Sequence, residues 1–289
     1  MRHILNLLAS SLNNLVLDAT LLSAYPLIGT IPLPHLTHLR HVGKPWRVID
    51  VAKLPSQSTI TSLCLGPEEP QLTAIIPSGV LPQLRELSAP CSVGKYLIPG
   101  RPVTYFRDTS LKKVPMGEID DTLSYFTRST AGITDLEMCA ELTVPSLFAA
   151  LERRVPRIER FRLLTESDRF RHNPAFAAAP ENAVRTGAAA LKEVEIRFRA
   201  WLDCHKPPFI STSNCRTIFE ALERACVALE VVTFTVVGSG EKFEEDTSDL
   251  PPQSIFKFCK TGTGAWEERR WGTYICAGSG SHGCSPRRI

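Results

Sequence analysis

The sequence predicts an α/β fold, an irregular solenoid of short parallel strands with interleaved helices. The first observation is an apolar-x-x-apolar-x-apolar pattern, which begins at residues 12, 36, 60, 84, 103, 133, 158, 191 and 229. Its first three steps are 24 residues each, and the later steps range from 19 to 38. The second is an apolar-Pro-x-apolar lead-in at Leu33, Leu81 and Val155, just before three of the copies. Because one such unit cannot bury its apolar face alone, the units are expected to stack into a continuous core.

Each copy of the pattern predicts one short strand, since its last residues alternate between apolar and other side chains. The expected parallel strands are 15–17, 63–65, 136–138, 161–163, 194–197 and 231–236. The copies beginning at Leu36, Leu84 and Val103 are weaker, because the last apolar position holds His41, Ala89 or Asp108. The long intervals 163–191 and 196–229 should hold loops or extra helix, because Asn173-Pro174 and Pro207-Pro208 interrupt regular strand pairing.

Three stretches between the strands have the spacing of amphipathic helices. Ile119, Leu123 and Phe126 recur at helical intervals, and so do the apolar residues from Leu147 to Val155. The longest stripe runs from Arg216 to Leu229 and includes Ile218, Phe219, Leu222, Ala225 and Cys226. All three stripes are interpreted as core-facing sides of helices.

The chain changes character after residue 237. We expect the solenoid to span 1–237 and residues 238–289 to form a linker, a terminal hairpin and a tail. Gly238-Ser239-Gly240 and the acidic run Glu241 to Asp246 are typical of a linker. The alternating segment 255–259 and the segment 266–271 predict the hairpin, and the chain from Gly278 onward predicts a frayed tail.

Composition excludes several function classes. A net charge of +3, with 43% hydrophobic and 22% charged residues, does not predict a charge-driven binder of nucleic acid or membranes. The most apolar run, residues 225–237, is far shorter than the ~20 apolar residues of a membrane span. The nine cysteines include no CxxC pair, which favours reduced intracellular thiols over a secreted disulfide framework.

The repeats resemble the leucine-rich repeat region of fungal F-box proteins, the substrate receptors of cullin-type ubiquitin ligases. The resemblance rests on the irregular repeat lengths, the Leu-Pro-x-Leu lead-ins, and the stretch Leu97-Ile98-Pro99-Gly100-Arg101-Pro102-Val103. It implies a cytoplasmic or nuclear protein-recognition module without chemistry of its own. No stretch here matches the F-box, so we expect a Skp-type adaptor to bind only if an F-box lies upstream. The alternative is a solitary leucine-rich-repeat scaffold or inhibitor with no ligase role.

A solenoid of this kind would bind its protein partner on the concave face of its sheet. That face is formed by the residues that alternate with the core positions of each strand. The candidate partner-binding residues are Val16, Asp18, Ser62, Cys64, Asp135, Glu137, Arg160, Arg162, Glu193, Glu195, Arg197, Thr233 and Thr235.

No motif for catalysis, a metal or a cofactor stands out. Gly278-x-Gly280-x-x-Gly283 lacks room for a following helix, so we expect no nucleotide site. His38 and His41 should point to opposite faces of a strand, and the Cys204-His205-Cys215 and Cys276-His282-Cys284 groups lack zinc-site spacing. We therefore expect no catalytic residue, no metal and no cofactor.

Arginines gather between residues 153 and 171, interleaved with acidic residues such as Glu159. The mixed signs predict a solvated, salt-bridged surface. The alternative is an acidic partner, phosphorylated or not, held by the guanidinium groups.

Overall fold

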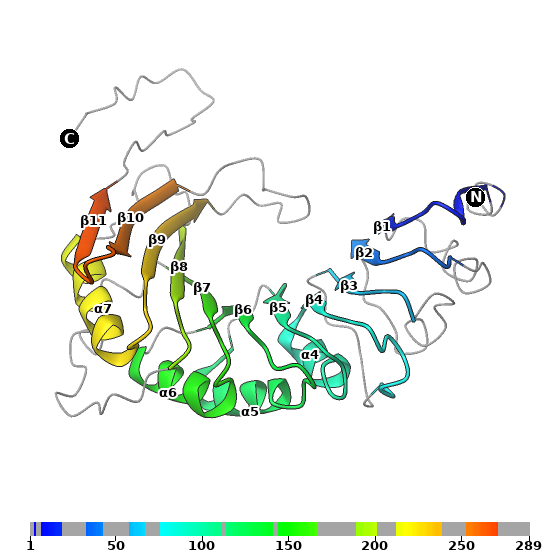
Figure 1. The fold of residues 1–289 in the computed structure, drawn as a ribbon, viewed down its shortest axis with the longest axis horizontal. Helices are drawn as coiled ribbons and strands as arrows, with labels where there is room; N and C mark the ends of the chain where they lie inside the picture. Colours follow the sequence, from blue (N-terminus) through cyan, green and yellow to red (C-terminus); the bar gives the residue numbers. More distant parts are fainter. Residues whose placement is uncertain are drawn as a thin grey trace, which may run out of the picture.

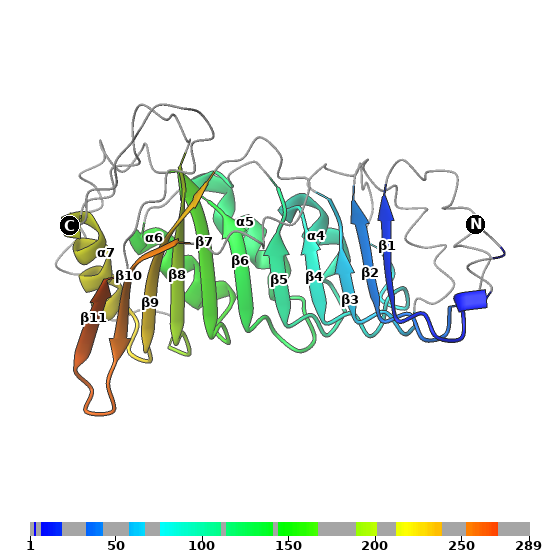
Figure 2. The same ribbon diagram turned by 90° about the horizontal axis from the view of Figure 1, so that it is seen from above.

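The chain forms an open, eleven-stranded sheet in an α/β arrangement. The computed structural model describes residues 3, 7–18, 33–42, 58–66, 76–110, 114–140, 144–166, 189–200, 212–238 and 253–270. The strands lie side by side in the order of the sequence (Figure 2). They are β1 (Asn14–Asp18), β2 (His38–Val42), β3 (Ser62–Cys64), β4 (Glu86–Ala89), β5 (Tyr105–Asp108), β6 (Asp135–Cys139), β7 (Arg160–Glu166), β8 (Glu193–Ala200), β9 (Val231–Gly238), β10 (Gln253–Lys260) and β11 (Trp266–Arg270).

Strands β1 to β9 are parallel, and their register confirms the predicted repeat spacing. The central apolar residue of each copy pairs with the central residue of the next. Leu15 pairs with Leu39, Leu39 with Leu63, and the column ends where Val194 pairs with Val232. The strands at the weaker copies, β2, β4 and β5, take their places in the same column. The whole column is Leu15, Leu39, Leu63, Leu87, Phe106, Leu136, Phe161, Val194 and Val232.

The sheet bends into an arc, and its helices lie along the outer side (Figure 1). The helices that the structure gives bounds for are α4 (Cys91–Leu97), α5 (Met116–Phe126), α6 (Val144–Arg154) and α7 (Thr212–Ala225). The three predicted helices correspond to α5, α6 and α7, although α7 ends four residues before the predicted Leu229. The core fills the layer between the helices and the sheet, where Phe106, Phe126 and Phe161 are almost completely buried.

Helix α4 was not expected from the sequence. It is only 7 residues long, too short to show a helical stripe, and it contains Gly94 in its middle. That glycine lets the helix approach the core closely, because a Cβ added there would lie 3.0 Å from the ring of Phe106. The close approach explains why a residue of poor helical propensity occupies this position.

A ladder of backbone hydrogen bonds holds the starts of successive strands together. One carbonyl before each strand accepts two N–H groups from the next unit. Asn13 O binds the amides of Thr37 and His38, and Thr37 O binds those of Thr61 and Ser62. The backbone carbonyls of residues 61, 85, 104, 134, 159 and 192 each accept the same pair of hydrogen bonds from two consecutive amides of the next unit. Strand alignment is therefore fixed at this edge, whatever the length of chain between strands.

The segment that carries the family resemblance is built around a buried arginine. Arg101 is fully buried, and its guanidinium donates five hydrogen bonds to backbone carbonyls. The acceptors lie on two segments, Ile76–Val80 and Leu97–Pro99. Burial lowers the pKa of Arg101 to about 10, so the group stays charged at neutral pH. It binds the turn after α4 to the preceding unit.

We predict that Gly100→Ala lowers the free energy of unfolding by about 2–4 kcal/mol. Gly100 has a φ of +74°, which disfavours any side chain, and the new Cβ would lie 2.8 Å from the Cβ of Ser78. The measurement is urea denaturation followed by circular dichroism.

The double variant Gly100→Ala/Ser78→Gly separates the two causes. It removes the clash and should leave only the backbone cost of about 1–2 kcal/mol. Equal losses in the single and double variants would show that the contact with Ser78 is irrelevant.

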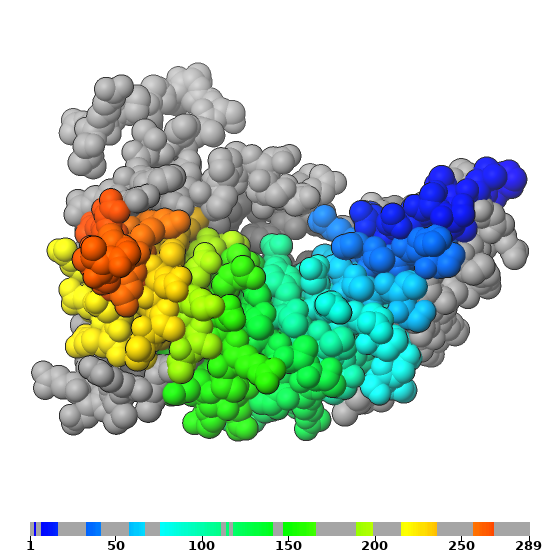
Figure 3. Space-filling model, viewed as in Figure 1, coloured from blue at the N-terminus to red at the C-terminus, as the bar shows by residue number. Residues whose placement is uncertain are grey.

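The predicted hairpin forms, and it continues the same sheet. Strand β10 pairs antiparallel with β9 on one side and with β11 on the other. Its Phe258 stacks on Phe219 of α7 at 4.1 Å between ring centroids, and Phe219 meets Trp266 edge-on at 5.0 Å. The hairpin thus extends the sheet past residue 237 and closes the core at its C-terminal end, the orange end of the continuous body in Figure 3.

Several expectations fall on residues outside the described ranges. They are the Asn173-Pro174 and Pro207-Pro208 interruptions, Cys204-His205, the acidic run Glu241 to Asp246, and the tail from Gly278. Within the described ranges, no helix is both long and apolar enough to cross a membrane.

Candidate functional site

One face of the sheet carries charged side chains and no described helix. Parallel sheets are usually covered on both faces, so an uncovered and polar face is unusual. Here α4 to α7 all lie on the outer side of the arc, and the inner side presents the alternating residues of the strands (Figure 1). We call this inner side the uncovered face. It is the face that the sequence predicted for a partner.

The register places the predicted residues in rows across the uncovered face. Asp135, Arg160 and Glu193 are paired on β6, β7 and β8, and Glu137, Arg162 and Glu195 form the next row. Ser62 and Cys64 lie on β3, Val16 and Asp18 on β1, and Thr233 and Thr235 on β9. The side chain of Asp18 is outside the described set. Val16 is 63% exposed, whereas Ser62, Cys64 and Thr233 are half-buried.

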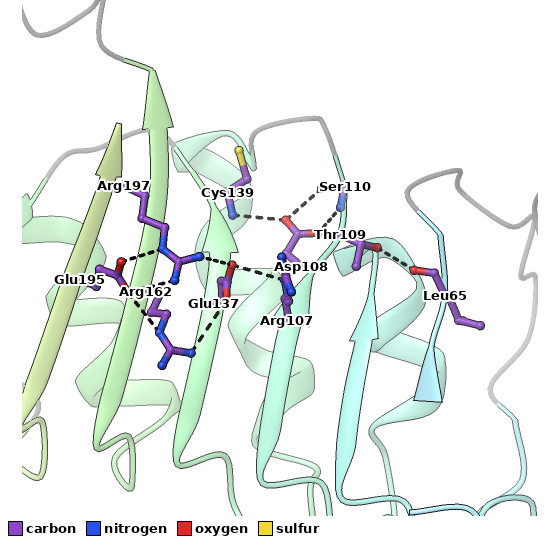
Figure 4. A network of polar contacts seen from close by, with 10 residues as sticks. All are labelled: Leu65, Arg107, Asp108, Thr109, Ser110, Glu137, Cys139, Arg162, Glu195 and Arg197. Atoms are coloured by element: carbon purple, nitrogen blue, oxygen red, sulfur yellow. Dashed lines mark hydrogen bonds and ion pairs between the residues drawn. The ribbon is translucent and has the colours of Figure 1, made fainter. Parts of the chain in front are cut away.

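The centre of the face is an ion-pair network that we call the central charge cluster. Its members are Arg107, Glu137, Arg162, Glu195 and Arg197 (Figure 4). Glu137 is contacted by all three arginines, at 3.4 Å from Arg107, 4.0 Å from Arg162 and 3.1 Å from Arg197. Glu195 is contacted at 3.3 Å by Arg162 and at 2.8 Å by Arg197. Three guanidinium groups therefore share two carboxylates on four adjacent strands.

Burial and neighbouring charges shift the pKa values of two residues at this cluster, Arg197 and Tyr105. Desolvation acts against the charge of Arg197, but the hydrogen bonds that Arg197 donates to Glu195 and the charge of Glu137 outweigh it, so the pKa of Arg197 is raised. Burial, together with the Glu137 carboxylate, raises the pKa of the neighbouring Tyr105. At neutral pH Arg197 is therefore charged and lies near the neutral phenol of Tyr105.

Two predicted residues are less exposed than a solvent-facing position implies. Glu137 is 9% exposed because three arginines surround it. Thr235 is 1% exposed, since β8 and β10 flank it and its hydroxyl donates to Glu195 Oε1 at 3.3 Å. Both residues therefore support their neighbours and present little surface to a partner.

Sequence reasoning missed Tyr105 and Arg107 on β5. The repeat beginning at Val103 was recognised, but its alternating residues were not included among the candidates. The register Tyr105 to Asp135 and Arg107 to Glu137 shows that they belong to the same two rows. Applying the alternation rule to the weaker repeats would have found them.

A second polar cluster, around Asp108, lies at the far end of β5. Its carboxylate accepts hydrogen bonds from the amides of Cys91, Ser110 and Cys139 at 3.2, 2.9 and 3.4 Å. Desolvation raises the pKa of Asp108, while these hydrogen bonds oppose the increase. Burial, with the nearby Asp108 charge, also raises the pKa of the Cys91 thiol. Such a thiol is a poor nucleophile, so the cluster serves to join α4, β5 and β6.

The arginine-rich segment 153–171 divides between the two sides of the sheet. Arg153 and Arg154 both bind Asp120 of α5, and hydrogen bonds from Arg154 and Arg153 lower the pKa of that carboxyl. Arg160 binds Asp135, and Arg162 belongs to the central charge cluster. The expected salt-bridged surface is confirmed for these four arginines. Arg169 and Arg171 lie outside the described ranges.

Among the described residues, no three His, Cys, Asp or Glu side chains are placed to hold a metal ion. No cysteine in the part of the chain that the structure describes forms a disulfide bond; these cysteines are Cys64, Cys91, Cys139, Cys215, Cys226 and Cys259. As predicted, His38 is exposed and His41 is buried, so the two imidazoles do not converge.

Neither protein-family models nor the sequences of curated proteins give a match to this chain. The functional argument therefore rests on the residues and contacts of the uncovered face.

Proposed function

We propose that this chain is a protein-recognition module that holds a partner on the uncovered face of its sheet. It is similar to the substrate-binding leucine-rich repeats of an F-box ubiquitin-ligase receptor, and it carries out no chemistry of its own. The observation that carries the proposal is the central charge cluster, an ordered set of charges on the one sheet face without described helices.

The geometry of the sheet supports this role. A curved sheet of parallel strands offers a broad surface on which side chains from many strands contact one ligand, as in repeat proteins. The strand-start ladder and the core column recur at the spacing of the sequence repeats, which favours a leucine-rich-repeat solenoid. The described cysteines form no disulfide bond, which suits the cytoplasm or nucleus, where we place the protein.

The energetics of the face also suit recognition. Arg107 and Arg162 are partly exposed, at 52% and 31%, and ion pairs of exposed arginines contribute only about 0–1 kcal/mol each to stability. Stability alone therefore does not explain the exposed arginines of the central charge cluster. Charges arranged in this way contribute mainly to specificity and to the rate of association. A surface of this kind distinguishes partners by the pattern of their own charges.

Site-specific photocrosslinking tests the proposal. One crosslinking residue replaces Arg160, whose side chain is 54% exposed on the uncovered face. The matched control replaces Arg153, which is 59% exposed on α6 at the opposite side. In a lysate of the source cells, we expect a discrete crosslinked protein from position 160 and none from position 153.

Equal products from both positions, or products from position 153 alone, would contradict the proposal. Mass spectrometry of the crosslinked product identifies the partner. Presence of a Skp-type adaptor in the same complex separates a ligase receptor from a solitary scaffold.

A further inference from the structure

The strand register sorts the charges of the uncovered face by sign. The row nearest the strand starts is acidic, with Glu86, Asp135 and Glu193 against the single cation Arg160. The second row lies two residues further along each strand. This row is basic when it is taken together with Arg197, which lies two residues beyond it on β8. It holds Arg40, Arg107, Arg162, Arg197 and Lys257 against the two carboxylates Glu137 and Glu195. A partner crossing the strands over this second row meets an excess of positive charge.

Arg107 and Arg162 have more N–H donors than their carboxylate contacts use. A guanidinium has about five N–H donors in a planar fork. Arg107 is 52% exposed, and its closest contact with Glu137 is through Nε at 3.4 Å. Arg162 is 31% exposed, and its contacts run through Nε to Glu195 and Nη1 to Glu137. Two carboxylates cannot satisfy three such groups, so N–H donors of Arg107 and Arg162 remain for a ligand.

The spacing of these two groups suits an acidic segment of protein. Arg107 on β5 and Arg162 on β7 are separated by one intervening strand, which places their backbones roughly 10 Å apart. Carboxylates separated by a similar distance along a partner could each accept a forked pair of hydrogen bonds. Nucleic acid is disfavoured, because Glu137 and Glu195 would oppose a continuous phosphate backbone.

We propose that the partner segment bound by the uncovered face is acidic and that Arg107 and Arg162 hold its carboxylates. This inference rests on the proposed function and specifies the chemistry of the partner. The acidic first row, with Asp135 and Glu193, orients the segment, because it repels carboxylates that are displaced toward the strand starts.

Fluorescence anisotropy of the full chain with two labelled peptides of equal length, oligoglutamate and oligolysine, tests this inference. We expect binding of oligoglutamate that weakens as salt is added, and no comparable binding of oligolysine. The double variant Arg107→Gln/Arg162→Gln should weaken oligoglutamate binding by roughly tenfold or more.

Two further variants make the test specific. Arg153→Gln/Arg157→Gln removes the same charge from exposed arginines outside the cluster, and it should change binding by less than about twofold. Glu137→Gln removes a competing carboxylate while keeping the side-chain shape, so it should tighten binding of oligoglutamate. Circular dichroism of each variant checks that the fold is retained.

The outcomes separate this inference from the proposed function. Equal weakening by the two double variants, or a preference for oligolysine, would overturn the acidic-partner inference. If the crosslink from position 160 persists in that case, the proposed function stands alone. Absence of that crosslink would overturn the proposed function itself.

Discussion

Replacing Arg101 with methionine should lower the free energy of unfolding by about 3–5 kcal/mol. Methionine fills much of the same space but donates no hydrogen bond. Five carbonyl contacts would be lost at once, on two separate segments of the chain. Because the site is fully buried, water cannot easily replace the guanidinium. Urea denaturation of the variant and the parent measures the loss.

Two further substitutions test whether the loss of stability in Arg101→Met comes from the buried hydrogen bonds. Arg101→Lys keeps the charge but offers fewer donors without the planar fork, so its stability should fall between those of the parent and Arg101→Met. Arg85→Met removes an exposed arginine nearby and should cost less than about 0.5 kcal/mol. If Arg101→Met and Arg85→Met were equally stable, the buried arginine would have no structural role.

Phe258→Ala should cost about 3–5 kcal/mol and loosen the C-terminal hairpin from the sheet. The ring is 4% exposed, stacks on Phe219, and meets Phe234 of β9 edge-on at 6.1 Å between centroids. Its loss leaves a cavity where α7, β9 and β10 meet. We expect amide exchange in residues 253–270 to accelerate more than in β6 to β8.

Cys259→Ala is the matched control for Phe258→Ala. Cys259 is the next residue on β10, is half-buried, and points to the other face of the sheet. Its substitution should leave hairpin exchange and stability nearly unchanged. A detached hairpin would also expose the edge of β9, so light scattering should report association of the Phe258→Ala variant alone. Uniform exchange acceleration across the sheet would contradict a local closing role for this ring.

The apolar repeat predicts the strands well because the repeat and the strands both follow from one physical requirement. Each strand must turn its central residue toward the core on the outer side of the sheet, and parallel pairing brings successive central residues into one column. Leu39, Leu87 and Phe106 fit that column although their repeats end in polar or small residues. The polar ending at Asp108 is explained by its hydrogen bonds to backbone amides at the end of β5.

The candidate face was predicted in position but not in detail. Alternation along a strand tells which residues share a face, and it placed Arg160, Arg162 and Glu195 correctly. It cannot tell which charges from distant repeats become neighbours, because that depends on register across strands. Arg197 meets Glu137 across 60 residues of sequence, and only the paired strands show that contact.

Because carbonyls at the strand starts are shared between neighbouring units, the alignment of the strands does not depend on the length of chain between them. Intervals from 19 to 38 residues all return to the same pair of amide contacts. Insertions and deletions on the outer side can therefore accumulate while the charges on the inner face keep their relative positions. A chain built this way can change the length of its connecting segments during evolution and still keep one pattern of charges on the uncovered face. It can also change that pattern one residue at a time without refolding.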